Sequence, residues 1–322
     1  MSKVIIGVHG LGNKPRERLL ASWWKRSIRE GLAARGCWHH LFRFRLAYWA
    51  RHLHPEPRDP RIKDPDHPRY LREPYRPSPG PRERRSDAFR RRLLDYLERQ
   101  FDRLFLNEDL TLNYSFISDW VIHRYFRDLE AYYGEGPGET EEPGHSLRYR
   151  IREEVALLIR RWAGHDIMLV GHSMGSIICY DVLSQLVPDV QVDTFVTLGS
   201  PLGIPVVMSR IAAELPLGQH PGGSLRVPPN IRTAWYNLAD LEDKVTLNYS
   251  ISDDYAASDR EVAVVDRVVE NDYEVDGRPN PHKVYGYLRT PEMAEIVREF
   301  LQRDASRAAL LVNEGLSRLL RV

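Results

Sequence analysis

The sequence predicts an α/β fold in which a mostly parallel sheet is flanked by helices. Short apolar runs rich in β-branched residues alternate along the chain with segments whose apolar residues have helical spacing. Continuous apolar runs are typical of strands that are covered on both faces of a parallel sheet. The chain has 322 residues, of which 42% are hydrophobic and 28% are charged, so it has enough apolar side chains for one large core or two modest ones.

The first strand is expected at residues 3–10, KVIIGVHG, where β-branched residues run continuously until a glycine cluster stops them. Residues 20–36 have apolar side chains at helical spacing and a glycine where a helix would end. The alternating pattern of residues 40–50 predicts a second strand. By the same criteria, the later elements are helices at 146–164, 176–186 and 290–304, the last with Pro291 near its start, and strands at 166–170, 192–200, 231–240 and 261–269.

One region interrupts this alternation. We expect residues 55–144 to form an inserted cap over one end of the sheet, and residues 1–54 and 145–322 to form the core. Residues 55–81 are crowded with proline and arginine, which excludes regular secondary structure and predicts an ordered wrap or a mobile loop. The arginines provide a local positive excess, which fits a solvated surface as well as binding of an anionic substrate or peripheral contact with lipid head groups. The rest of the insertion includes an amphipathic helical stretch at 86–105 and an aromatic-rich stretch at 119–133.

Charge and composition argue against several classes of protein. Lysine plus arginine (46) nearly balance aspartate plus glutamate (45), so no net field favours binding to nucleic acid. The two cysteines, Cys37 and Cys179, are too few for a disulfide framework, and no spacing of cysteine and histidine indicates a metal site. No apolar run approaches the length of about 20 residues that a membrane span needs, and MSKVIIGVHG leads directly into a strand. A cytoplasmic protein is therefore expected.

The motif GHSMG, residues 171–175, has the pattern G-x-S-x-G of a nucleophile elbow. Glycine is needed on both sides of the serine because the strand reverses sharply into a helix and a Cβ atom there would clash. A predicted buried strand precedes the motif and a predicted helix follows it, which is the context that such an elbow requires. The pattern therefore favours Ser173 as a nucleophile over a small residue in an inert turn.

A serine hydroxyl is a weak nucleophile at its own pKa and requires a base oriented by a carboxylate. The segment ADLEDKVT follows a predicted strand and offers Asp240, Glu242 and Asp243 as the acid. The segment GRPNPHKVYGYL offers His282 on a loop rich in glycine and proline just before the final helix. The resulting chain order of serine, aspartate and histidine is that of the α/β-hydrolase triad.

Taken together, these motifs make the sequence similar to the α/β-hydrolase superfamily, and within it to lipase-like and esterase-like serine hydrolases. The resemblance covers residues 4–53 and 146–301, leaves the insertion unmatched, and implies a sheet that opens at the third strand of larger members. Five segments carry it: VIIGVHGLGN, LVGHSMGS, VTLGSPLG, YNLADLEDKV and NPHKVYGYL.

The resemblance implies further roles for individual residues. In lipase-like relatives the acid often stands in a D-x-V context, which here is DKV, so Asp243 is preferred and Asp240 is the alternative. Such relatives bind the tetrahedral oxyanion with two backbone N–H groups, which by position belong to Leu11 and Met174. Gly10 and neighbouring glycines would let that loop approach the substrate closely.

The expected activity is hydrolysis of a carboxylic ester through an acyl-enzyme intermediate. No cofactor is expected, because GVHGLG has the spacing G-x-x-G-x-G and not that of a dinucleotide-binding loop. The expected partner is a small-molecule or lipid-like acyl ester. The same triad also serves thioesterases, amidases and acyltransferases, and a non-catalytic binding or scaffold module on this fold is a further alternative. The sequence makes no prediction of the oligomeric state.

Overall fold

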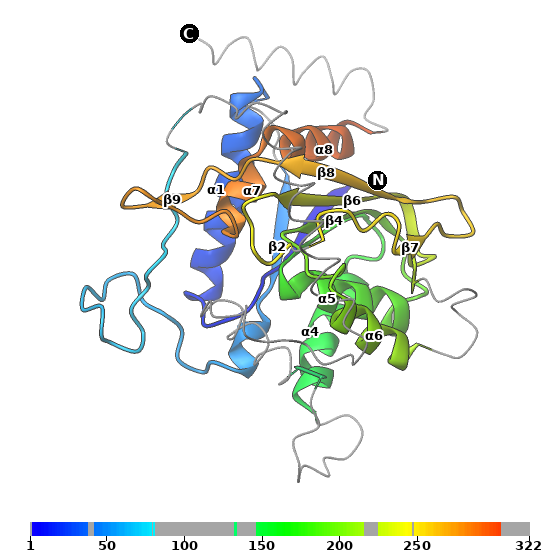
Figure 1. Cartoon of the computed structure of the whole chain (residues 1–322), viewed down its shortest axis with the longest axis horizontal. Coiled ribbons are helices and arrows are strands. Elements are labelled where there is room, and N and C mark those ends of the chain that lie inside the picture. Colours follow the sequence, from blue (N-terminus) through cyan, green and yellow to red (C-terminus); the bar gives the residue numbers. More distant parts are fainter. Residues whose placement is uncertain are drawn as a thin grey trace, which may run out of the picture.

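The core of the computed structural model is a parallel sheet of six strands in the order β2-β1-β3-β4-β6-β8 (Figure 1). The structure describes residues 2–37, 42–78, 80, 132–133, 146–215, 225–246 and 248–303. The strands of the central sheet are β1 (Lys3–Val8), β2 (Arg43–Ala47), β3 (Asp166–His172), β4 (Val192–Leu198), β6 (Ile231–Asp240) and β8 (Val264–Val269). Two short pairs lie outside it: β5 (Leu225–Arg226) with β7 (Tyr255–Ala256), and β9 (Glu274–Val275) with β10 (Arg278–Pro279).

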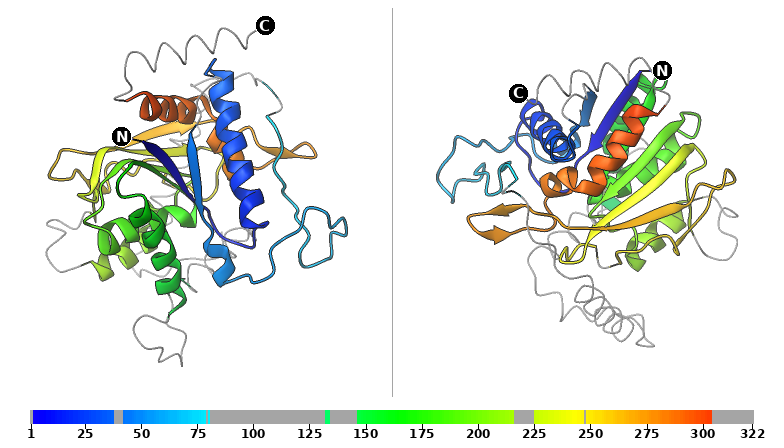
Figure 2. Two further views of the ribbon diagram at one scale, coloured as in Figure 1. Left: turned by 180° about the vertical axis from the view of Figure 1, so that it is seen from behind. Right: turned by 90° about the horizontal axis from the view of Figure 1, so that it is seen from above.

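Helices cover both faces of this sheet. On one face lie α1 (Glu17–Ala34), α7 (Val284–Arg289) and α8 (Pro291–Gln302), and on the other lie α4 (Leu147–Arg161), α5 (Met174–Asp181) and α6 (Pro205–Glu214) (Figure 2). Neighbouring residues of one strand serve opposite cores: Val4 and Ile6 of β1 pack on the α4–α6 face, whereas Ile5 packs on the α1 face. The continuous apolar strands are explained by this burial on both sides.

The structure confirms the predicted α/β architecture and refines its boundaries. β3 runs on to His172, and α5 begins at the residue after Ser173, so the reversal from strand to helix is tighter than predicted. Helix α5 ends at Asp181 and passes into a π-helical turn, Val182–Leu186. Helices α6 and α7 were not predicted. Helix α7 has only six residues and contains a glycine, which is too short a segment for helical periodicity to be evident.

Residues 55–78, which we call the strap, contain no helix or strand and are held to the core by hydrogen bonds. The Tyr273 hydroxyl donates to the Pro74 carbonyl at 2.6 Å, and the Arg289 guanidinium donates to the Arg76 carbonyl at 2.6 Å. Tyr75 donates to the Glu30 carboxylate on α1. Of the two predicted alternatives for this proline-rich segment, the ordered wrap is therefore confirmed.

Most of the predicted cap lies outside the described residues, and its boundaries stay a prediction. Tyr132 and Tyr133 are described, and both are buried against the core on the α4–α6 face. The Tyr132 hydroxyl donates to the carboxylate of Asp181 at 2.8 Å and accepts from Arg152 at 2.7 Å. This end of the insertion is therefore part of the packed core.

Other sequence expectations concern the cysteines and the membrane. Neither cysteine forms a disulfide; Cys179 is buried and Cys37 is partly buried. None of the described helices combines the length and the apolar character needed to cross a bilayer.

The contact between α1 and α7 gives a testable prediction, because a Cβ atom on Gly31 would lie 2.9 Å from the Cα atom of Arg289. Alanine normally favours a helix over glycine by about 1 kcal/mol. We expect Gly31→Ala nevertheless to lower the free energy of unfolding by about 1–3 kcal/mol, because backbone atoms cannot yield like a flexible side chain. Urea denaturation measures it, with Gly164→Ala as the control, since no atom lies within 4 Å of a Cβ built there. A Gly31→Ala variant as stable as the parent would contradict the close packing.

Candidate active site

The candidate site lies where the strand connections change direction. In the sheet, β2 is the neighbour of β1 on one side and β3 is its neighbour on the other side. The chain runs from β1 to β2 and only later enters β3. The loops that follow β1 and β3 therefore diverge, and a crevice forms between the carboxyl ends of these two strands. Ser173 follows β3, and Leu11 lies on the loop that follows β1.

Ser173 occupies the turn between β3 and α5 in a conformation that favours glycine. Its φ is 53° and its ψ is −128°, and its backbone N–H donates to the Leu198 carbonyl of β4 at 2.9 Å. For a residue with a side chain such angles cost on the order of 1–3 kcal/mol and persist only when the surroundings impose them. Strain of this kind is characteristic of functional positions.

The two glycines of the motif are required by close packing. A Cβ atom on Gly171 would lie 2.7 Å from the Cα atom of Ser176, in the first turn of α5. A Cβ atom on Gly175 would overlap the Val8 carbonyl oxygen of β1. The helix therefore approaches both its own strand and the neighbouring strand so closely that only glycine fits, as the motif predicts.

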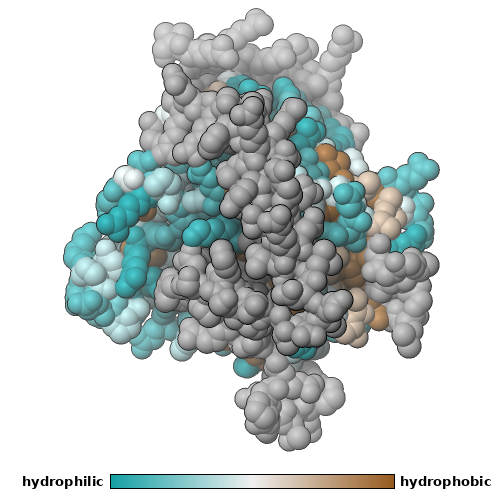
Figure 3. Space-filling view, in the orientation of Figure 1, coloured by the Kyte–Doolittle hydropathy of each residue, from teal (hydrophilic) through white to brown (hydrophobic). Residues whose placement is uncertain are grey.

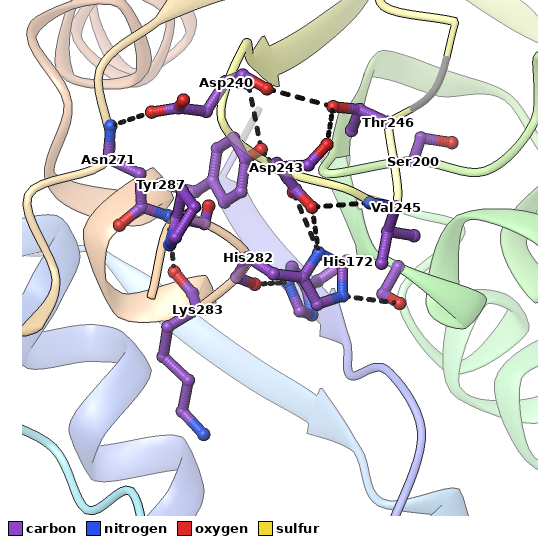
Figure 4. A network of polar contacts seen from close by, with 12 residues as sticks. His172, Ser200, Asp240, Asp243, Val245, Thr246, Asn271, His282, Lys283 and Tyr287 are labelled. Carbon is purple, nitrogen blue, oxygen red and sulfur yellow. Dashed lines mark hydrogen bonds and ion pairs between the residues drawn. The ribbon is translucent and has the colours of Figure 1, made fainter. Parts of the chain in front are cut away.

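The structure brings Ser173, His282 and Asp243 together, although they lie far apart in the sequence (Figure 4). The Nε2 atom of His282 lies 3.0 Å from the Ser173 hydroxyl oxygen. The Nδ1 atom lies 2.8 Å and 3.0 Å from the two carboxylate oxygens of Asp243. With Nδ1–H donating to the carboxylate, the hydrogen-bond network assigns Nε2 as the free lone pair that can accept the serine proton.

Of the two candidate acids, only Asp243 contacts the His282 ring. Its carboxylate also accepts hydrogen bonds from the Val245 N–H at 2.9 Å and from the Tyr287 hydroxyl at 2.7 Å. Asp240 instead braces the loop, because its carboxylate accepts from the backbone N–H groups of Glu242 at 2.8 Å and Asn271 at 2.6 Å. The alternative acid therefore lies near the site but supports its backbone.

Several supporting residues were missed by the sequence analysis. Tyr287 of α7 joins the two aspartates, since its hydroxyl donates to Asp243 and accepts from the Asp240 N–H at 3.0 Å. Burial, with the nearby charge of Asp243, raises the pKa of Tyr287 well above its usual value, so it remains a donor. The Asn271 side chain donates to the carbonyls of Pro281 and Lys283 at 2.7 Å and 2.8 Å, and thus holds the backbone on both sides of the histidine.

His172 packs against the loop that carries His282. Its ring centroid lies 4.9 Å from that of His282, and its Nε2 atom lies 2.8 Å from the His282 carbonyl oxygen. Burial lowers the pKa of His172 well below its usual value. A neutral His172 therefore donates its Nε2–H to that carbonyl and holds the backbone of His282 in place.

Of the two predicted oxyanion donors, Met174 directly follows the serine, and Leu11 lines the same cleft as the serine. The Met174 N–H is the first of α5, and the first N–H groups of a helix have no acceptor within the helix. Leu11 is preceded by Gly10, on which a Cβ atom would lie 2.8 Å from that of Ser173. The loop therefore approaches the serine closely, as the resemblance implies.

His9 fixes the start of this loop. Its Nδ1 atom lies 2.8 Å from the Gly10 carbonyl oxygen, and its ring stacks on Trp49 with centroids 4.7 Å apart. Trp49 donates its indole N–H to the His9 carbonyl at 2.8 Å. Burial, followed by the charge of Lys14, lowers the pKa of His9 well below its usual value, so its role is structural.

A cleft of about 640 Å³, which we call the main cleft, is lined by Ser173 and His282. One wall is the loop after β1, residues 10–15, and the other is formed by strap residues 65–73. The strap is joined to the histidine loop through Glu73, which accepts from Asn280 and pairs with Lys283. Residues of the predicted insertion thus line the cleft that contains Ser173.

No protein-family model matches the sequence, and a search of curated proteins finds no match either. Among the described residues, no group of three or more histidine, cysteine, aspartate or glutamate side chains could hold a metal ion. Ser200 is buried, and its hydroxyl oxygen lies 2.7 Å from that of Ser176 in the first turn of α5.

The strained backbone at Ser173 reverses the usual order of stability between alanine and glycine. At an ordinary position glycine is less stable than alanine by roughly 0.5–1 kcal/mol. Here we expect Ser173→Gly to unfold at the same or a higher urea concentration than Ser173→Ala, because only glycine adopts the angles without strain. Both variants lack the hydroxyl, so their difference isolates the backbone. A clearly more stable Ser173→Ala would show that the turn relaxes.

Proposed function

We propose that this protein is a serine hydrolase of the α/β-hydrolase type that cleaves carboxylic esters. The observation that carries the proposal is the unbroken chain of hydrogen bonds from Ser173 through His282 to Asp243, with 3.0 Å on the serine side and 2.8 Å on the acid side. A nucleophile within reach of a base that is itself oriented by a third group is the signature of nucleophilic catalysis.

In the proposed reaction, His282 removes the proton from Ser173 as the hydroxyl oxygen attacks the ester carbonyl. The tetrahedral oxyanion is bound by the backbone N–H groups of Leu11 and Met174. His282 then gives the proton to the leaving alcohol, and an acyl-enzyme remains. Water activated by the same histidine releases the acid, while Asp243 stabilises the imidazolium in both halves of the cycle.

The surrounding fold supports this assignment. A parallel sheet with helices on both faces carries the serine on a tight turn from strand to helix, with the acid and the histidine on later loops. The chain order of serine, aspartate and histidine is that of α/β-hydrolases, and chymotrypsin-like and subtilisin-like enzymes have other orders. Hydrolysis of a thioester or an amide and acyl transfer would use the same groups, so the choice among them depends on the substrate.

A purely binding module is a weaker explanation. Ser173 adopts a strained backbone, and Asp243 is only 3% exposed, so both positions reduce stability. A scaffold has no need of a buried carboxylate aimed at a histidine that faces a serine. Such costs are typical of sites selected for chemistry.

The first test is covalent labelling with a fluorophosphonate, followed by intact-mass measurement. We expect the parent protein to gain one adduct at Ser173, because His282 activates this hydroxyl. Ser173→Ala and His282→Ala should gain none, and Ser176→Ala provides a matched control for a neighbouring buried serine. Absence of an adduct on the folded parent would falsify the proposed activity.

A second prediction separates the two aspartates. Asp243→Asn should lower kcat/KM on an aryl ester by about 10³–10⁴-fold, because the amide no longer favours the required tautomer of His282. Asp240→Asn keeps only one of the two oxygens that accept from Glu242 and Asn271, but it leaves the pair of Asp243 and His282 intact. We therefore expect its kcat/KM to stay within about tenfold of the parent. Equal losses in the two variants would refute the assignment of Asp243 as the orienting acid.

A further inference from the structure

The main cleft carries an excess of positive charge. Its described charged side chains, the histidines apart, are four cations and two carboxylates: Lys14, Arg58, Arg72 and Lys283 against Asp66 and Glu73. The Glu73 carboxylate lies 2.9 Å from the Lys283 ammonium, so this pair is largely neutral. The remaining excess therefore lies on the loop after β1 and on the strap, which are the two walls that face the serine.

The neighbouring cleft, of about 650 Å³, has the opposite balance. Apart from His282, its described charged side chains are three cations and four carboxylates: Arg72, Lys244 and Arg278 against Glu73, Glu242, Asp243 and Asp276. The positive excess is therefore a property of the main cleft and not of this whole side of the molecule. The space-filling view shows that this side, with the strap and the β9–β10 hairpin, is hydrophilic (Figure 3).

Two cations of the main cleft are hydrogen-bonded to backbone carbonyls. Lys14 donates to the Leu11 carbonyl, and Arg58 donates to the Tyr70 carbonyl at 3.1 Å. Burial is the largest cause of the low pKa values of His9 and His172, and the positive charge of Lys14 lowers both further. The charge of Lys14 therefore acts on both of these buried histidines.

Arg72 is the most available of these groups. Its side chain is exposed, and it makes no hydrogen bond or ion pair with another residue in the described parts of the chain. It lines both clefts beside His282, within reach of a ligand bound at the serine. A guanidinium offers a planar set of donors that matches a carboxylate or a phosphate.

We propose that the ester substrate carries an anionic group, a carboxylate or a phosphate, that binds to Arg72 with support from the charges of Arg58 and Lys14. This inference rests on the proposed function, because it places the anion beside an ester held at Ser173. The uncharged lining, including Leu71 and Tyr285, contacts the rest of the molecule. The cleft therefore selects an ester by charge as well as by apolar contact.

The test uses two pairs of esters in which a carboxylate is replaced by an uncharged carboxamide of the same shape. In the first pair the group is on the acyl side: the 4-nitrophenyl esters of hexanedioic acid and of its monoamide. In the second it is on the leaving group: the butyrate esters of 3-hydroxybenzoic acid and of 3-hydroxybenzamide. The readout is the ratio of kcat/KM between the members of a pair, in the parent and in Arg72→Gln. For a compound that is not turned over, the readout is its protection of Ser173 against the fluorophosphonate.

We expect the carboxylate-to-carboxamide ratio of at least one pair to fall about fivefold or more in Arg72→Gln, because a charge-assisted hydrogen bond is lost. Arg278→Gln is the matched control, since this exposed arginine lines only the neighbouring cleft. In the parent, the same ratio should fall as salt is raised.

The outcomes distinguish the inference from the proposed function. Fluorophosphonate labelling of Ser173 together with ratios that Arg72→Gln leaves unchanged in both pairs would overturn the anionic substrate alone. A fall of the same size in Arg278→Gln would also overturn it, because the effect would then come from general surface charge. Absence of both labelling and turnover would overturn the proposed function, and the inference with it.

Discussion

The position of the His282 ring depends on one hydrogen bond, that between its Nδ1–H and the Asp243 carboxylate. This bond joins the loop after β6 to the segment before α7, and the ring then faces a serine that follows β3. Three segments distant in sequence can meet in this way because the parallel strands end at one edge of the sheet. The rest of the site consists of groups that hold these three segments at the required distance.

The supporting groups supply hydrogen bonds to the buried carboxylate of Asp243. A carboxylate removed from water is costly unless such bonds replace its lost hydration. The Val245 N–H, the Tyr287 hydroxyl and the His282 ring supply these bonds. Tyr287 can serve only if it remains protonated, which its burial ensures by raising its pKa. The buried carboxylate thus has hydrogen-bond donors on its oxygens, and a missing donor there would be strongly destabilising.

The sequence predicted those parts of the site that depend on contacts between residues close together in the chain. The elbow could be predicted because its rule is local: Gly171 and Gly175 stand next to the serine whose turn requires them. The residues alone left several acids open, because which carboxylate faces His282 depends on how the loop folds after β6. Only the resemblance favoured Asp243 over Asp240. Tyr287 was missed because it contacts Asp243 across 44 residues of sequence, from a six-residue helix that has no periodic pattern. Pairings of this kind leave no local signal.

The strap also contacts the segment that carries His282. Its Glu73 carboxylate accepts from the Asn280 side chain at 2.6 Å and pairs with Lys283, the residue after His282. Burial alone would raise the pKa of Glu73, but Lys283 and the hydrogen bonds lower it below its usual value, so the carboxylate is charged and the link is ionic. Arg72 precedes Glu73 in the chain. In the proposed reaction, an anion bound by Arg72 therefore lies next to the residue that anchors the histidine loop. Binding of such a substrate would stabilise the strap in the position in which His282 faces the serine.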